Sequence, residues 1–510
     1  MMASRVRSAG RWIQAALATL VFLSVLAVQV WGSAPQDSET PNEERWFIVQ
    51  MDGQRAGWMH TKLTRGEKET TIETEMRFKI ARGEIEIPIQ MASRFTGDSA
   101  TGAPISAWSM QKYAQVPVET EWKFEADGII VRTKQGAQVD ETREPLPEGQ
   151  WLTPIQVLDE SLKAFKAGLQ TQTLRSIDPT AGLQPFNTTW TLVSSDVEIE
   201  NAEGKKIKVL KYKTVTDIMP SLEGAEYCTP DGEMIRTDMP MGGMELRMMR
   251  TTREDALQKT KAPELMLKTF VTPDKPIPHA RSARKVVMDL SVTAGSLPDL
   301  PTSGSQTFVR TDDRSGRLTV TMDPTIPAPA EDATNPDFLT ATRFIDSDDA
   351  AIRELVHKAV EGVGPDKMAR AEAMRRFVYG YINKKALDVA FATASEIAQN
   401  RTGDCSEHGV LLAAMLRADG MPARVVSGLL YVDEFMGAEG IFGYHMWAQA
   451  LIDGKWVDFD ATLPTARFDA THIGVAPATL KDGAMGMEMA ALLPLMGRLE
   501  IKVVSTDPQR

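Results

Sequence analysis

One of the two cysteines in this chain has a sequence context typical of a nucleophile. Asp404 and Glu407 form an Asp-x-x-Glu pattern that predicts a helix capping box, with Asp404 as the N-cap. Cys405 then occupies the first helical position, where the helix dipole and unpaired backbone N–H groups favour a thiolate. The same N–H groups can receive the oxyanion of an acyl-transfer intermediate. The alternative is a structural cysteine on a buried helix.

A histidine and an aspartate downstream complete the set of residues that thiol acyl-transfer chemistry needs. Asp453 and Gly454 separate two strand-like runs and predict a two-residue type I′ hairpin turn. In that register His445 and Asp460 are diagonal neighbours on one face, with Cα atoms about 7–8 Å apart. We predict Cys405 as the nucleophile, His445 as general base and acid, and Asp460 as the carboxylate that orients the imidazole. A core histidine beside a surface aspartate is the alternative.

Two further histidines lie near these residues in the sequence. His408 follows Cys405 by one helical turn, so a zinc site with His445 is an alternative interpretation, although a fourth ligand is missing. We expect His408 and Glu407 to be capping or supporting groups. His472 is ambiguous, because it sits in a strand or turn that can return toward the site. No metal and no organic cofactor is predicted.

The elements that position these residues belong to the last of several domains. The chain has 510 residues, which predicts about three domains. Period-two alternation in 44–258 predicts a β-rich domain of antiparallel sheet, interrupted by one helix, 155–167, that Thr153 caps. Residues 262–335 predict a small β domain that ends in a proline-rich linker. Helical spacing begins near residue 340, and the domain 340–510 carries the candidate site.

Composition and the N-terminal residues indicate where the protein works. The net charge of −12 argues against nucleic acid as a partner. Arginines followed by an apolar run from Trp12 to Trp31 indicate that residues 1–34 are a signal peptide or an uncleaved membrane anchor. We therefore expect an exported protein in the periplasm, in the cell envelope or outside the cell. Export would permit a Cys228–Cys405 disulfide, but we expect Cys228 to be a buried apolar residue instead.

Four motifs in the C-terminal part of the chain resemble one known family. They run from Thr402 to His408, from Gly420 to Gly428, from His445 to Ala448 and from Trp456 to Thr462. Together they resemble the transglutaminase-like superfamily, in its bacterial exported branch, over about 340–475. The resemblance implies a papain-like α+β core in which the nucleophile helix packs on an antiparallel sheet. It also implies catalytic roles for Cys405, His445 and Asp460, and no calcium loop is visible.

The expected fold is multidomain. Mostly antiparallel β domains form the N-terminal part, and a transglutaminase-like (papain-like) α+β core forms the C-terminal part. The segment 262–335 looks like the β domain that often precedes this core. One residue departs from the family pattern, because Ala461 follows the aspartate where proline is usual. We expect this departure to leave the catalytic residues unaffected.

The expected function is that of an exported thiol-dependent acyl-transfer enzyme. It would act on a peptide or glutamine carboxamide carbonyl of a protein or peptide substrate, through a thioester acyl-enzyme. Hydrolysis would make it a cysteine protease or amidase, and aminolysis a transglutaminase; the sequence does not choose between them. The alternative is a non-enzymatic envelope protein that keeps the fold as a binding scaffold. The glycine-containing segment 435–443 is expected to be a loop that could act as a lid.

Overall fold

The computed structural model describes most of the chain, in two compact units. The described ranges are 42–82, 85–112, 117–135, 138–241, 243–264, 266–383, 392–480 and 492–508. The units divide between residues 264 and 265, and each has hydrophobic clusters of its own. The predicted signal peptide or anchor, 1–34, lies outside the described ranges and stays a prediction. Within those ranges, no helix is long and apolar enough to cross a membrane.

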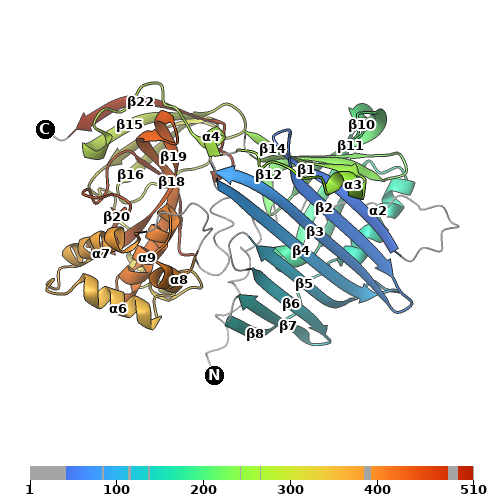
Figure 1. Ribbon diagram of the computed structural model, residues 1–510, viewed down its shortest axis with the longest axis horizontal. Helices are drawn as coiled ribbons and strands as arrows, with labels where there is room; N and C mark the ends of the chain where they lie inside the picture. Colours follow the sequence, from blue (N-terminus) through green and yellow to red (C-terminus); the bar gives the residue numbers. More distant parts are fainter. Residues whose placement is uncertain are drawn as a thin grey trace. The chain divides into compact units, whose positions relative to one another are not determined.

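The described part of the N-terminal unit is built on one antiparallel sheet. Its strands are β1 (Asn42–Met51), β2 (Gln54–Arg65), β3 (Glu69–Arg82), β4 (Ile85–Asp98), β5 (Pro104–Lys112), β6 (Val118–Glu125), β7 (Gly128–Gln135), β8 (Gln138–Glu144), β9 (Thr171–Ser176), β10 (Phe186–Glu200), β11 (Lys206–Thr216), β12 (Met219–Cys228), β13 (Met234–Met241) and β14 (Met244–Thr251). Their order across the sheet is β8-β7-β6-β5-β4-β3-β2-β1-β14-β13-β12-β11-β10-β9 (Figure 1). Pairing of β1 with β14 joins two runs of sequential hairpins, which confirms the predicted antiparallel sheet.

The predicted helix is present as α2 (Pro154–Lys166), and it packs on this sheet. Thr153 and Gln156 form a capping box at its start, and Pro154 occupies its first turn. Its buried residues Ile155 and Leu158 share a hydrophobic cluster with side chains of the sheet. Among the described residues of this unit, the other helices are the short η1 (Pro179–Ala181) and α3 (Arg253–Ala256).

The same sheet holds a buried carboxyl group. Glu226 of β12 is 1% exposed, and Trp190 of β10 and Thr214 of β11 are the polar side chains that act on its carboxyl group. Burial raises the pKa of Glu226 to about 8, and the two polar neighbours lower it by less. Glu226 is therefore mostly protonated at neutral pH.

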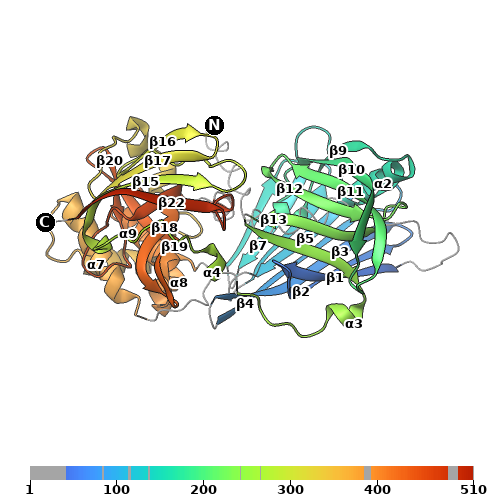
Figure 2. The ribbon, with the colours of Figure 1, turned by 90° about the horizontal axis from the view of Figure 1, so that it is seen from above.

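The described part of the C-terminal unit contains two antiparallel sheets. The first has the order β16-β17-β15-β22 and the second β20-β19-β18-β21. The strands of the first sheet, which Figure 2 shows side by side, are β15 (Ala283–Val292), β16 (Gln306–Asp312), β17 (Ser315–Thr321) and β22 (Leu499–Pro508). Those of the second sheet are β18 (Ala423–Phe435), β19 (Ala438–Ile452), β20 (Lys455–Phe459) and β21 (His472–Ala478).

Helices cover one face of the second sheet. They are α6 (Ala350–Ala359), α7 (Lys367–Tyr381), α8 (Ala394–Asn400) and α9 (Cys405–Ala418), which gather beside β18 and β19 in Figure 1. Their apolar side chains pack against Met446 and Ala448 of β19 and against Val457 and Phe459 of β20. Because side chains alternate along a strand, His445 and Asp458 lie on the opposite face. The described part of this unit also contains the short helices α4 (Met266–Thr269), η2 (Ala280–Ser282), η3 (Ala330–Ala333) and α5 (Pro336–Leu339).

Three features of this unit differ from the sequence analysis or add to it. The segment 435–443, expected to be a loop, is the tip of the β18–β19 hairpin, so it does not have the form of a lid loop. Strand β16 lies in a region interpreted as a loop, and β22 pairs with β15 from Leu499 opposite Val292 to Pro508 opposite Ala283. The end of the 340–510 segment therefore completes a sheet of the 262–335 segment, and the predicted boundary between them stays a prediction.

Candidate active site

The first turn of α9 has the capping geometry that the sequence predicts. Asp404 is the N-cap, and its Oδ1 accepts hydrogen bonds from the Ser406 N–H at 2.9 Å and the Ser406 hydroxyl at 2.6 Å. Glu407 Oε2 accepts a hydrogen bond from the Asp404 N–H at 2.8 Å, which completes the capping box. Cys405 is the first helical residue and is partly buried. It therefore lies at the positive end of the helix dipole.

Glu407 carries little negative charge at neutral pH. Burial, reinforced by the charge of Asp404, raises the pKa of Glu407 to about 8. A neutral carboxyl group two residues after Cys405 does not repel a thiolate as an ionised one would. The capping box thus fixes the helix start, and its negative charge lies mainly on Asp404 and not on Glu407.

Gly403 leaves the space that the Glu407 side chain occupies. A Cβ atom at position 403 would lie 2.3 Å from Glu407 Cβ and 2.6 Å from Glu407 Cγ. These separations are far below van der Waals contact, so any other residue at 403 would push Glu407 out of the capping box.

We expect Gly403→Ala to weaken the start of α9. Overpacking of a tight site costs about 1–3 kcal/mol, and loss of a helix cap typically costs about 1 kcal/mol more. Urea unfolding of the full chain measures the change. Gly380→Ala in α7 is the matched control, because a Cβ there meets nothing within 4 Å and alanine favours the helix. Equal unfolding midpoints for the two variants would contradict this account of Gly403.

Helix α9 packs directly on the strand that carries His445. A Cβ atom at Gly409 would lie 3.3 Å from Met446 Cγ and 3.6 Å from the Cα of Trp447, so the helix backbone approaches β19 closely. Cys405 lies one helical turn before Gly409, on the same side of the helix. His445 lies next to Met446 in β19, so its ring projects from the face of the sheet opposite the one that α9 covers. The N-terminal half of α9 therefore packs on the β19 backbone next to His445, and Asp460 holds the His445 ring on the other face.

The predicted register of the hairpin that carries His445 is confirmed. Residues 448–452 pair with 455–459, so that Ile452 lies opposite Lys455 as expected. The turn residues Asp453 and Gly454 have positive φ angles of 49° and 71°, as a type I′ turn requires.

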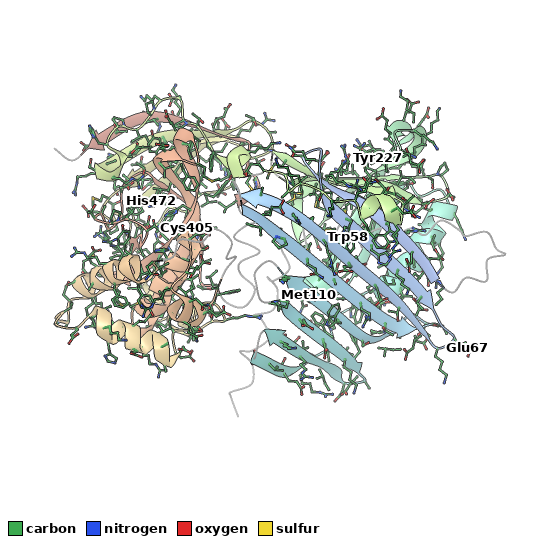
Figure 3. The ribbon with its side chains drawn as sticks, in the orientation of Figure 1. Trp58, Glu67, Met110, Tyr227, Cys405 and His472 are labelled. Carbon is green, nitrogen blue, oxygen red and sulfur yellow. The ribbon has the colours of Figure 1, made fainter. Side chains whose placement is uncertain are left out.

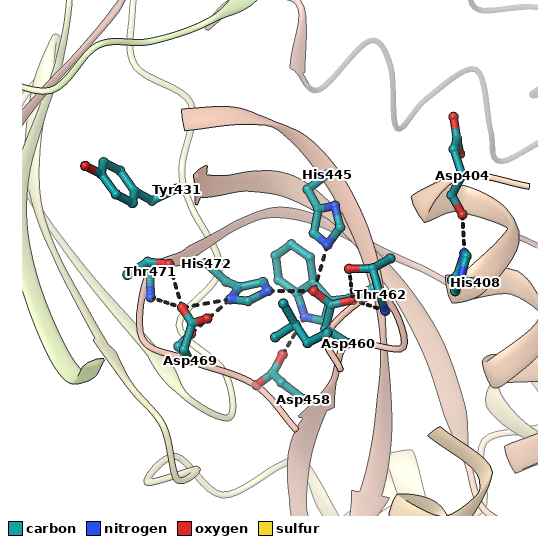
Figure 4. Close-up of polar contacts among 12 residues, drawn as sticks. Asp404, His408, Tyr431, His445, Asp458, Asp460, Thr462, Asp469, Thr471 and His472 are labelled. Carbon is teal, nitrogen blue, oxygen red and sulfur yellow. Dashed lines mark hydrogen bonds and ion pairs between the residues drawn. The ribbon is translucent and has the colours of Figure 1, made fainter. Parts of the chain in front are cut away.

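This register brings His445 and Asp460 together. His445 Nε2 lies 2.9 Å from Asp460 Oδ2 (Figure 4). Asp460 Oδ1 accepts hydrogen bonds from the Thr462 N–H at 2.8 Å and the Thr462 hydroxyl at 2.7 Å. Burial alone would raise the pKa of Asp460, but the charges and hydrogen bonds of His445 and His472 hold it well below its ordinary value. Asp460 is therefore an ionised acceptor, His445 Nε2 carries a hydrogen, and His445 Nδ1 is left to accept a proton.

A buried arginine fixes the backbone on which Asp460 sits. The Arg375 side chain of α7 is 0% exposed. Its Nη1 donates to the carbonyl oxygen of Leu463 at 2.6 Å and to that of Asp460 at 3.4 Å. Its Nε donates to Glu372 Oε2 at 2.8 Å, which compensates the buried charge. The helical layer thus holds the turn that follows β20.

The structure also places His472, which the sequence left ambiguous, in this cluster. His472 is the first residue of β21, and its Nε2 lies 3.1 Å from Asp460 Oδ2. Figure 3 marks His472 and Cys405 in the C-terminal unit. A sequence signal was available, because Asp469-Ala470-Thr471 immediately before His472 repeats Asp460-Ala461-Thr462. In both copies the threonine N–H and hydroxyl bond Oδ1 of the aspartate.

The same three residues satisfy the distance requirement of a metal site. The nearest ligand atoms of His445, Asp460 and His472 lie within 4.8 Å of one another. The two nitrogen-to-carboxylate distances, 2.9 Å and 3.1 Å, are those of ordinary N–H···O hydrogen bonds, so N–H donation accounts for the geometry. The zinc site considered from the sequence would need His408, whose Nδ1 lies 2.5 Å from the Asp404 carbonyl oxygen in its own helix. We therefore interpret this centre through hydrogen bonds and not through an ion.

The second cysteine has a different environment. Cys405 and Cys228 form no disulfide, so both are thiols. Cys228 is 0% exposed, which confirms the prediction of a buried residue. Burial raises the pKa of the Cys228 thiol well above its ordinary value, so this thiol is inert at neutral pH.

Comparison with known families identifies the domain that carries this site. Residues 353–461 match the family model of the transglutaminase-like superfamily. The match confirms the predicted resemblance, and the C-terminal unit carries a transglutaminase-like domain with a papain-like fold. Cys405, His445 and Asp460 fall inside the matched residues, and His472 falls outside them. No curated protein matches the chain.

Several solved structures are similar to parts of the chain at low identity. A β-barrel-like protein of a domain of unknown function from Brucella abortus is 13% identical, with a TM-score of 0.31, and the match covers 42% of this chain and 96% of that one. A candidate cysteine protease from Cytophaga hutchinsonii is 16% identical, with a TM-score of 0.28 and coverage of 44% and 90%. A TGase is 15% identical, with a TM-score of 0.18 and coverage of 32% and 46%. With TM-scores this low, none of the three structures is used to infer the function of this chain.

Proposed function

We propose that the chain is a thiol-dependent acyl-transfer enzyme that acts on peptide or glutamine carboxamide carbonyls. The observation that carries the proposal is the 2.9 Å contact between His445 Nε2 and Asp460 Oδ2. It lies on the strand against which α9 packs, with Cys405 at the start of that helix. A carboxylate that holds Nε2–H leaves Nδ1 as the base for a thiol. Histidine in this tautomer beside a cysteine at a helix start is the arrangement that thiol catalysis needs.

The proposed reaction has two halves. Cys405 Sγ attacks the carbonyl carbon while its proton passes to His445 Nδ1, and backbone N–H groups at the start of α9 stabilise the oxyanion. The C–N bond then breaks, the leaving amine takes the proton from His445, and a thioester remains on Cys405. Water or a second amine gives a proton to His445 and attacks the thioester. The product leaves, and the proton returns to Cys405.

The surroundings of Cys405 support a reactive thiol over a structural one. The body of α9 is fully buried, with residues 410–416 at 0–1% exposure, but Cys405 at its start is partly exposed. A purely structural cysteine would sit more naturally in the buried part, as Cys228 does in its own sheet.

The proposal is tested by incubating the wild type and Cys405→Ala with casein and a labelled primary amine. We expect Cys405-dependent incorporation of the amine if the acceptor is an amine. Cys405-dependent release of ammonia or peptides without incorporation would assign a hydrolase. Cys228→Ala is the control and should keep the activity, because its thiol is buried. If the wild type and Cys405→Ala behave alike on casein and on a panel of envelope proteins, the enzyme proposal is overturned in favour of a binding scaffold.

A further inference from the structure

The Asp460 carboxylate faces two histidines, of which the proposed reaction uses one. The His472 side chain is 0% exposed, and its Nε2 lies 3.1 Å from the same Oδ2 that bonds His445 (Figure 4). On the other side of the ring, His472 Nδ1 lies 2.9 Å from the carbonyl oxygen of Asp469. Each ring nitrogen of His472 therefore has an oxygen at hydrogen-bond distance.

These contacts determine which atoms of His472 carry hydrogens. A carbonyl oxygen can only accept, so His472 Nδ1 must donate to Asp469. Asp460 is ionised, so its carboxylate oxygens carry no hydrogen and can only accept. Thr462 supplies two donors at Oδ1, and His445 and His472 supply one each at Oδ2. His472 Nε2 must then donate as well, and a ring with two N–H groups is an imidazolium.

Compensating charges make a buried imidazolium possible at this position. Asp469 Oδ1 lies 3.5 Å from His472 Nδ1, and Asp469 Oδ2 lies 2.7 Å from Arg281 Nη1. Charges therefore alternate from Arg281 through Asp469 and His472 to Asp460. Burial alone would lower the pKa of His472, but the carboxylates of Asp469 and Asp460 raise it to about 9.

Side chains from the other surrounding elements also face the His472 ring. Trp447 and Phe468 contact it with ring centroids at 5.0 Å and 4.4 Å. Arg424 and Asp458 line the same small cavity as His472. These two carry opposite charges, so they largely offset each other and leave Asp460 and Asp469 as the dominant partners.

We propose that His472 is a positioning residue that holds the Asp460 carboxylate ionised and directed at His445. This inference rests on the proposed function and extends the catalytic set by one residue that does not touch the substrate. Asp460 is buried, and without the second N–H donor and its positive charge the carboxyl group would take up a proton more readily. A protonated Asp460 no longer fixes the Nε2–H tautomer of His445, so Cys405 loses its base.

The test measures alkylation of Cys405 by iodoacetamide across pH, which needs no known substrate. We expect the wild type to react in mildly acidic solution. In His472→Leu the acidic limb of the profile should move up by about one pH unit or more, and the rate at pH 6 should fall at least about tenfold. His472→Gln keeps a donor near Nε2 and should recover part of both changes. His357→Gln, an exposed histidine of α6, is the matched control and should leave the profile unchanged.

The outcomes separate this inference from the proposed function. If the wild type reacts only as an ordinary thiol, the enzyme proposal fails. If the wild type is reactive and His472→Leu has an unshifted acidic limb, the positioning role is overturned and the enzyme proposal stands. A lower rate at every pH without a shift of the limb would show a merely structural role and also overturn the inference.

A second measurement does not depend on whether the leucine variant folds. Long-range ¹H–¹⁵N NMR of the wild-type chain reports the protonation of each imidazole nitrogen. We expect the His472 signals, identified by their loss in His472→Gln, to show two protonated nitrogens at pH 7.5. A neutral His472 ring at this pH would overturn the inference, whatever the alkylation profile shows.

Discussion

Asparagine in place of Asp460 is expected to lower the rate of Cys405-dependent acyl transfer by about 10³–10⁴-fold. The carboxylate accepts two donors from Thr462 at Oδ1 and one each from His445 and His472 at Oδ2. An asparagine side chain must turn its NH₂ group toward one of these pairs. If the NH₂ group takes the place of Oδ1, it meets the Thr462 backbone N–H, which can only donate. If it takes the place of Oδ2, His445 Nε2 must accept a hydrogen bond from it. His445 Nδ1 then carries the hydrogen and cannot act as the base.

The loss can be measured as the rate of acyl transfer in the casein assay or as the rate of Cys405 alkylation at pH 6. Asp453→Asn is the matched control, because Asp453 lies exposed in the turn of the same hairpin and asparagine tolerates its positive φ of 49°. That variant should retain wild-type activity. Activity within tenfold of wild type in a folded Asp460→Asn protein would contradict the role assigned to this carboxylate.

Glutamine in place of Glu226 is expected to stabilise the protein at alkaline pH. The folded-state pKa of Glu226 is raised from 4.5 to about 8, so its favourable contribution is complete below about pH 4.5 and is lost as the pH rises toward 8. Between pH 5 and pH 8.5 the wild type therefore loses on the order of 4 kcal/mol from this one group. The glutamine variant has no proton to lose, so it should be more stable than the wild type at pH 8.5 and similar or slightly weaker at pH 5.

Hydrogen exchange in peptides from β10 to β12, followed at both pH values, measures this difference where it arises. Glu223→Gln in the same strand is the matched control, because Glu223 is exposed and pairs with Lys213 at 3.0 Å. It should change the opening free energy by less than about 1 kcal/mol at either pH. Equal opening free energies for Glu226→Gln and the wild type at pH 8.5 would contradict the buried-acid account.

The parts of the site that short-range rules govern were predictable from the sequence. The capping box of Asp404 and Glu407 depends on residues three apart, and it places Cys405 at the helix start as predicted. A two-residue turn at Asp453-Gly454 determines its own register, so the contact between His445 and Asp460 followed from counting along two strands. The helix on the large sheet, capped by Thr153, was predictable for the same reason.

The parts that depend on distant pairing were not predictable in this way. Strand β22 is polar on one side and gives no local sign that its partner is β15, which lies about two hundred residues earlier. Strand β16 lies in a stretch whose serine, glycine and proline content favours a loop, and only pairing with β17 makes it a strand. His472 reaches Asp460 because β21 pairs with β18, on the side of β18 away from the His445 hairpin. The contact of His472 with Asp460 therefore depends on the order of the strands in the sheet, and the local sequence does not encode that order.

Pairing of β22 with β15 also constrains when the C-terminal unit can finish folding. During synthesis the strand that covers one edge of β15, Leu499–Pro508, is made about two hundred residues after β15 itself. Until then one edge of β15 exposes unpaired backbone groups, which attract other strands. This sheet therefore cannot be completed before residues 499–508 have been made, and a nascent chain paused before residue 499 keeps an exposed strand edge.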